Sequence, residues 1–290
     1  RTSRLKPFWL KGSSQAMSRS LRLLYGFWNA GDLEIIDPED YSACGAEIMV
    51  FTALVSWVLT LIFNRDVIQT NPLKERFGYN NVCVGWDEPP SLYVAPVLLC
   101  MAVFVAIRYC YLDQLRCNLH KDLFVMRKLV SCVANMGLAV SYAYLNIVFV
   151  VTPRVSAVWH TVPFLNLIVW TCIARAANFY EVENVYHRRG SWIYMGCLTA
   201  VSVLLIIGAG IQLGLYNEQS RQRGPIPWYI MMLLDYSWFI CLAVSGRFMP
   251  AAPSIKMVCS HASDADYEVV ACRSVRRVIP ARTLGSLTDA

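Results

Sequence analysis

The residues from Ser191 to Tyr216 form the longest stretch of this chain without a charged side chain. As an α-helix rising about 1.5 Å per residue, the stretch spans roughly 39 Å, enough to cross a hydrocarbon core of about 30 Å with some tilt. In lipid, only a helix or a closed barrel satisfies every backbone hydrogen-bonding group, and the stretch shows no strand-like alternation. The chain must therefore be organised around helices that cross a membrane.

The same pattern recurs along the chain and predicts an all-α, polytopic membrane protein with six transmembrane helices. The predicted crossings are residues 46–63, 92–107, 129–152, 155–174, 191–216 and 227–246. A basic and aromatic N-terminal segment (1–43) precedes this bundle (44–247), and a short polar C-terminal tail (248–290) follows it. Charged residues make up only 16% of the chain, against about a quarter in soluble proteins, which supports the membrane class.

The basic residues divide unequally between the two sides of the predicted bundle. About twenty Lys and Arg residues fall on the side that holds both termini, and about six on the other side. The positive-inside rule therefore predicts that both termini face the cytosol, or the matrix or stroma of an organelle.

The N-terminal segment has its own pattern. Residues 1–30 carry basic residues and no acid, and helical spacing separates Arg19 and Arg22 from an apolar face that ends at Trp28. This predicts an interfacial helix that binds membrane lipids, although a solvated basic arm remains the alternative. The composition is also typical of organellar targeting segments and favours the mitochondrial inner membrane. Because the chain begins with Arg1 and not with Met, we expect that either a presequence has been removed or the chain has been trimmed.

Polar side chains inside the crossings are candidates for function because each is costly in lipid. We expect an intramembrane cluster near the face with few charges, made of His160, Asp235, Asn146 and Gln212. In it, Asp235 points inward and pairs with His160. A second candidate cluster near the opposite face consists of Arg175, Glu47, Arg108 and Asn135. Such polar residues line a water-filled path or join helices by hydrogen bonds, and we favour the second interpretation.

Motifs for catalysis and cofactor binding are missing from the sequence. It contains no GxSxG, HExxH, Walker or GxGxxG pattern, and none of its 11 cysteines forms a CxxC pair. No basic block alternates with aromatic residues on a soluble domain, as it does in nucleic-acid-binding proteins. We therefore expect no enzyme activity, no cofactor, no metal and no nucleic-acid partner.

A long first outer loop ends in Asp87, Pro89 and Pro90, and His160 opens the fourth predicted crossing. With six crossings and both termini inside, this arrangement resembles the Frag1/DRAM/Sfk1 membrane family. The resemblance implies a six-helix membrane protein of that type. The chain departs from the family in lacking the glycines expected around this histidine.

Three functions remain open on the sequence. The first is a non-catalytic subunit that supports the structure or assembly of a larger mitochondrial-type membrane complex, with membrane lipids and other membrane subunits as its partners. The second is a transporter or channel for small solutes or ions, with a polar path through the third, fourth and sixth crossings. The third is a Frag1/DRAM-like membrane protein.

Overall fold

The computed structural model describes residues 35–36, 38–119, 123–181, 189–217, 222–249, 254–263 and 266–275. In these residues six helices are long and apolar enough to cross a membrane, so the predicted polytopic class is confirmed. They are α3 (Pro38–Phe63), α6 (Ser91–Leu119), α7 (Val125–Leu145), α8 (Ala157–Glu181), α9 (Arg189–Gly214) and α10 (Trp228–Phe248). A short 3-10 helix, η2 (Asn146–Phe149), continues α7.

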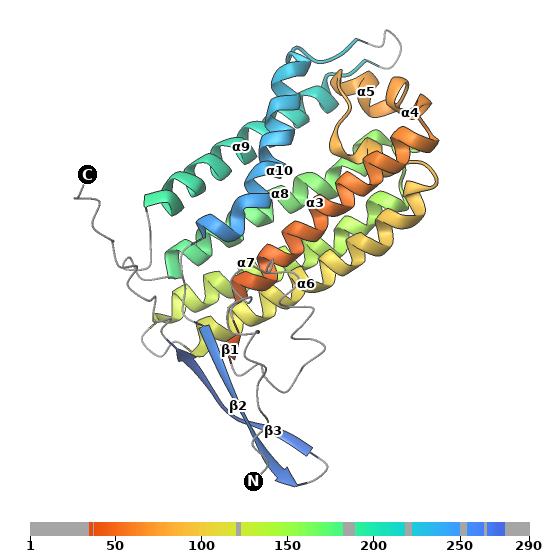
Figure 1. The fold of residues 1–290 in the computed structure, drawn as a ribbon. Helices are drawn as coiled ribbons and strands as arrows, with labels where there is room; N and C mark the ends of the chain where they lie inside the picture. Colours follow the sequence, from red (N-terminus) through yellow and green to blue (C-terminus); the bar gives the residue numbers. More distant parts are fainter. Residues whose placement is uncertain are drawn as a thin grey trace, which may run out of the picture.

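The six helices form a closed ring in which each packs on the next along the chain and α10 packs on α3 (Figure 1). The most extensive contact joins α3 and α6. A Cβ atom added at Gly45 of α3 would lie 3.4 Å from the Ala102 carbonyl oxygen of α6, so the two backbones approach closely. Small residues allow such close helix packing in a bilayer, where no hydrophobic force drives helices together.

The outer surface of the ring is apolar. Large hydrophobic side chains that are more than half exposed occur on the crossing helices, among them Leu54, Val97, Val140, Ile207 and Ile240. Such a continuous apolar surface is unfavourable in water and matches the lipid surroundings that the sequence predicts.

Three helices extend by about two turns or more beyond the apolar runs that predicted them. α3 begins at Pro38 rather than at residue 46, α6 continues to Leu119 rather than ending at 107, and α8 continues to Glu181 rather than ending at 174. The added turns carry acidic and arginine side chains that pair with one another in the interior. A hydropathy profile assigns these residues to the loops between crossings, because it counts every charged side chain as unfavourable in lipid whether or not the side chain is paired.

The first loop, predicted as a long polar connection, is a folded unit. It contains α4 (Asp66–Gln69), α5 (Pro72–Phe77) and the 3-10 helix η1 (Val82–Trp86). Asn71 caps α5 by accepting a hydrogen bond from the Lys74 backbone N–H at 2.7 Å, and Gly78 ends it with a left-handed φ of 86°. We call residues 64–90 the roof, because they cover one end of the ring (Figure 1).

A three-stranded antiparallel sheet lies at the opposite end of the ring from the roof, and the sequence did not predict it (Figure 1). It consists of β1 (Ile35–Ile36), β2 (Ser254–Ser263) and β3 (Asp266–Val275). β1 pairs with β2, with Ile35 opposite Lys256. The segments just before the first crossing and just after the last therefore lie at the same end, as an even number of crossings requires.

Candidate functional site

The roof is held to the ring by hydrogen bonds from two helices. On α3, Trp57 donates its indole N–H to the Val82 carbonyl at 3.1 Å, and Thr60 donates to the Gly85 carbonyl at 2.5 Å. On α10, Tyr236 donates its hydroxyl to the Asn80 carbonyl at 2.8 Å. These contacts fix the backbone of the roof over the interior of the ring.

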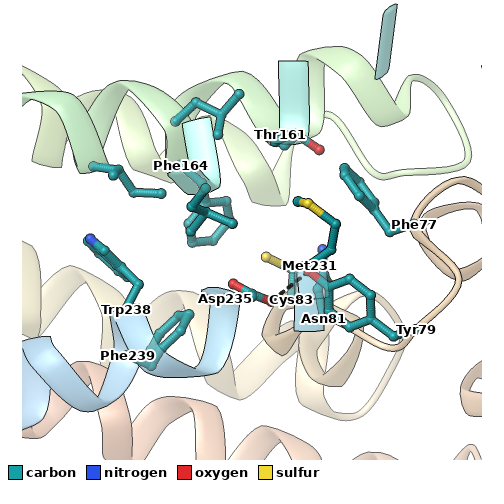
Figure 2. A pocket seen from close by; sticks show the side chains of 14 residues that line it. Phe77, Tyr79, Asn81, Cys83, Thr161, Phe164, Met231, Asp235, Trp238 and Phe239 are labelled. Carbon is teal, nitrogen blue, oxygen red and sulfur yellow. Dashed lines mark hydrogen bonds between the residues drawn. The ribbon is translucent and has the colours of Figure 1, made fainter. Parts of the chain in front are cut away.

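A pocket lies beneath the roof and inside the ring (Figure 2). The free space inside it is about 40 Å³, and the empty volume reaches about 520 Å³ only when the part that is open to the surroundings is included. Thr161 and Phe164 of α8 form one wall, and Asp235 and Trp238 of α10 lie across from them. α9 contributes Leu205 and Ala209. The pocket fills the space between α8 and α10, which are not neighbours in the ring.

The lining is mostly apolar, with Tyr79, Asn81, Thr161 and Asp235 as its polar side chains. The roof contributes four residues to it, namely Phe77, Tyr79, Asn81 and Cys83. The helical walls are completed by Leu165, Ile168, Met231 and Phe239. Pockets that take small ligands typically combine such an apolar lining with few polar groups.

Asp235 is the acidic group of this pocket. Tyr79 of the roof donates its hydroxyl to Asp235 Oδ2 at 3.3 Å, a bond drawn in Figure 2. Burial, followed by the Asp235 charge, raises the pKa of Tyr79, so its hydroxyl keeps the proton that it donates. Burial also raises the pKa of the nearby Cys83 thiol well above its usual value. A protonated thiol is a weak nucleophile, so the pocket is better suited to binding than to covalent chemistry.

The predicted outer cluster does not assemble. His160 Nδ1 lies 2.8 Å from the Val151 carbonyl oxygen and donates to it, and His160 Nε2 lies 3.7 Å from Asp87 of the roof rather than against Asp235. Gln212 donates to the Ile226 carbonyl at 2.7 Å, and Asn146 donates to the Ala143 carbonyl at 3.2 Å. The prediction matched residues by depth and treated the first loop as solvent. The folded roof instead supplies nearer partners for both His160 and Asp235.

Two members of the predicted inner cluster hydrogen-bond to buried side chains of other helices. Arg175 is 2% exposed, donates to the Tyr109 hydroxyl at 3.1 Å and also hydrogen-bonds Ser42. Asn135 donates to Asp113 Oδ2 at 2.9 Å. Of the other two members, Arg108 places its guanidinium over the Tyr41 ring, and Glu47 is half-buried on α3.

The Asp113 contact belongs to a group of buried side chains whose centre is a residue that sequence reasoning missed. Arg116 is 3% exposed and pairs with Glu39 of α3, Asp113 of its own helix and Glu181 of α8. Asn178 also donates to Asp113, at 3.2 Å. We call the group the Arg116 cluster and define it by these residues: Glu39, Asp113, Arg116, Asn135, Asn178 and Glu181. The available signal was the spacing of Asp113 and Arg116, three residues apart on one helix face.

The predicted lipid-binding residues Arg19, Arg22 and Trp28 lie outside the described residues. No known protein family, no curated protein and no solved structure matches this chain. The resemblance to the Frag1/DRAM/Sfk1 family therefore stays a prediction. Two of the residues on which it rests, Asp87 and His160, do lie side by side in the structure. The chain is thus assigned as a six-helix integral membrane protein with a roofed interior pocket, and its family stays open.

Proposed function

We propose that this protein binds the acyl chain of a lipid or fatty acid in the pocket beneath the roof. The observation that carries the proposal is the lining itself: apolar side chains from three helices surround a cavity within the ring, with Asp235 already hydrogen-bonded to Tyr79. An acyl chain that enters from the bilayer leaves surroundings that are already apolar, so close packing against this lining, rather than transfer out of water, supplies the binding free energy. The surrounding bilayer supplies ligands of this class.

A bulky side chain inside the pocket tests this proposal. Leu205 lines the pocket and is 5% exposed, whereas its neighbour Leu204 faces outward and is 54% exposed. In nanodiscs, a photoreactive fatty acid is expected to label the wild-type protein on pocket residues. Leu205→Trp fills the cavity and is expected to reduce labelling about tenfold, equal to a loss of about 1.4 kcal/mol in binding free energy.

Leu204→Trp is the matched control, since it adds the same side chain on the outer face of the same helix. It is expected to leave labelling unchanged. Equal labelling of both variants, or labelling spread over the outer surface of the ring, would show that the pocket does not hold the acyl chain.

A second candidate function is that of a non-catalytic subunit of a larger membrane complex, and an observation on α9 favours it. Cβ atoms added at Gly196, Gly210 and Gly214 would meet nothing within 4 Å among the described residues. Exposed small residues on a transmembrane helix are typical of surfaces where a partner helix approaches closely. The mitochondrial inner membrane is the location we propose for such a complex, and fractionation of cells tests it.

Replacing Gly210 and Gly214 together by leucine separates this candidate from a protein that works alone. The open space around both positions predicts that the variant folds and unfolds like the wild type. If a partner helix docks there, the wild-type protein is expected to migrate in a larger complex on a native gel, and the variant as a smaller species. Gly208→Leu is the opposite control: its side chain meets Met231 inside the protein and is expected to lower stability.

A further inference from the structure

His160 and Asp87 form a buried contact between α8 and the roof that the ligand proposal does not use. His160 Nε2 lies 3.7 Å from Asp87 Oδ1, and their side chains are 1% and 9% exposed. Among the described residues, His160 Nε2 and Asp87 Oδ2 have no hydrogen-bond partner. Buried polar atoms without partners are rare and costly, so the contact calls for a physical explanation.

The other ring nitrogen fixes where the proton of a neutral imidazole resides. His160 Nδ1 lies 2.8 Å from the Val151 carbonyl oxygen, which only accepts hydrogen bonds, so Nδ1 carries a proton. In a neutral imidazole Nε2 is then an acceptor. An ionised Asp87 is also purely an acceptor. With both residues in these forms, two lone pairs would face each other in a buried site without a donor between them.

We propose that Asp87 and His160 together bind one proton, and that this proton fastens the roof to α8 over the pocket. With the proton present, a neutral Asp87 donates to Nε2, or a charged imidazole pairs with the carboxylate. Without it, the contact is repulsive and the roof loses this attachment. The site thus takes a proton as its ligand, and its occupancy decides whether the roof stays closed.

The charges around Asp87 set the pH at which the proton leaves. Burial is the main cause that raises the pKa of Asp87, to about 8; the neighbouring Glu88 also raises it, and Arg154 lowers it. On the roof, the buried Cys83 thiol is the other titratable group near Asp87, and its own raised pKa keeps it neutral. Arg154, in the turn that precedes α8, pairs with Glu88 at 2.7 Å.

The sign of the pH dependence follows from linkage. The folded protein keeps the proton up to about pH 8, whereas the Asp87 side chain of an unfolded roof loses it at about pH 4. The stabilisation is therefore complete below about pH 4 and decreases as the pH rises through about 8. The roof is expected to be held most firmly at about pH 4 and to open more readily as the pH rises, until the effect levels off above about pH 8.

Amide hydrogen exchange of the roof in phospholipid nanodiscs tests the proposal without any added ligand. Asp87→Asn places a permanent donor against His160 Nε2 and imitates the protonated acid. Wild type and variant are compared at the same pH, so the intrinsic pH dependence of exchange cancels. We expect equal exchange of residues 79–90 at about pH 4, where the stabilisation is complete, and exchange at least tenfold faster in the wild type at about pH 9. Equal exchange at both pH values would overturn the proposal.

Two substitutions near the surface keep the test decisive if Asp87→Asn does not fold. Glu88→Gln and Arg154→Gln both break the same ion pair, but they change the charge near Asp87 in opposite directions. The midpoint of roof opening against pH is expected to fall for Glu88→Gln and to rise for Arg154→Gln, each by roughly half a pH unit. Shifts of the same sign, or no shifts, would show that the Asp87 proton does not control the roof.

The proton site and the acyl-chain proposal fail separately. Exchange of the roof reports the proton site whether or not the pocket holds a ligand. Photolabelling of the Leu205→Trp and Leu204→Trp pair reports the pocket at a single pH.

Discussion

Replacing Arg116 by glutamine is expected to lower the free energy of unfolding by about 3–5 kcal/mol, the usual cost of removing one partner from a buried ion pair. Arg116 joins Glu39, Asp113 and Glu181 and lies almost wholly inside the protein. Without it, three carboxyl groups remain buried with no cation among them, and each repels the others. Unfolding of the purified protein in mixed micelles, followed by circular dichroism, measures the effect.

Arg127→Gln is the matched control for this prediction. Arg127 lies on α7 and its guanidinium stacks on the Tyr180 ring, with its carbon 4.5 Å from the ring centre. Its loss is expected to cost about 1 kcal/mol or less. Adding Glu181→Gln to Arg116→Gln is expected to restore part of the stability, because one of the unpaired carboxyl groups is removed. If the second substitution lowers stability further, charge repulsion is not the cause of the defect.

Replacing Trp86 by alanine is expected to destabilise the protein by about 3–5 kcal/mol, as large-to-small changes at buried aromatic residues do. Trp86 ends η1 in the roof and is 1% exposed. Its ring stacks on Phe164 of α8 at 5.9 Å between centres and meets the Phe149 ring edge-on at 6.1 Å. The substitution leaves a cavity where the roof meets α8, so we also expect faster amide exchange in the roof.

Trp159→Ala is the control for Trp86→Ala. Trp159 is on α8, close to the same end of the ring, and is 62% exposed. Substitutions at exposed positions usually change stability by no more than about 0.5 kcal/mol. Similar losses for the two variants would mean that Trp86 contributes no more to stability than a tryptophan on the outer surface. The roof would then be attached by its hydrogen bonds alone.

The two ends of the ring are held by different chemistry. At the end that bears the β-sheet, the Arg116 cluster joins α3, α6, α7 and α8 through buried charges and amides. At the other end, aromatic packing and hydrogen bonds hold the roof over a pocket. The roof can therefore open while the Arg116 cluster stays intact.

The sequence by itself determined the class of the protein and the number of its crossings. Length and hydropathy suffice for this, because a lipid-crossing helix must satisfy its own backbone and present apolar side chains. The crossing over 191–216 matches α9 (Arg189–Gly214) within a few residues at each end. Few side chains of this run make long-range polar contacts, so local composition controls where the helix starts and stops.

The tertiary structure alone decided which polar residues meet. Depth along a helix does not fix the direction in which a side chain points or which helices are neighbours. Matching residues by depth alone therefore predicted a pair between Asp235 and His160. In the structure, Tyr79 of the roof hydrogen-bonds Asp235, and Asp87 of the roof lies against His160. Arg116 was likewise assigned to a connector, because hydropathy counts a charge as exposed. Only the packing of α3, α6 and α8 brings together the acids that let this charge remain inside the protein.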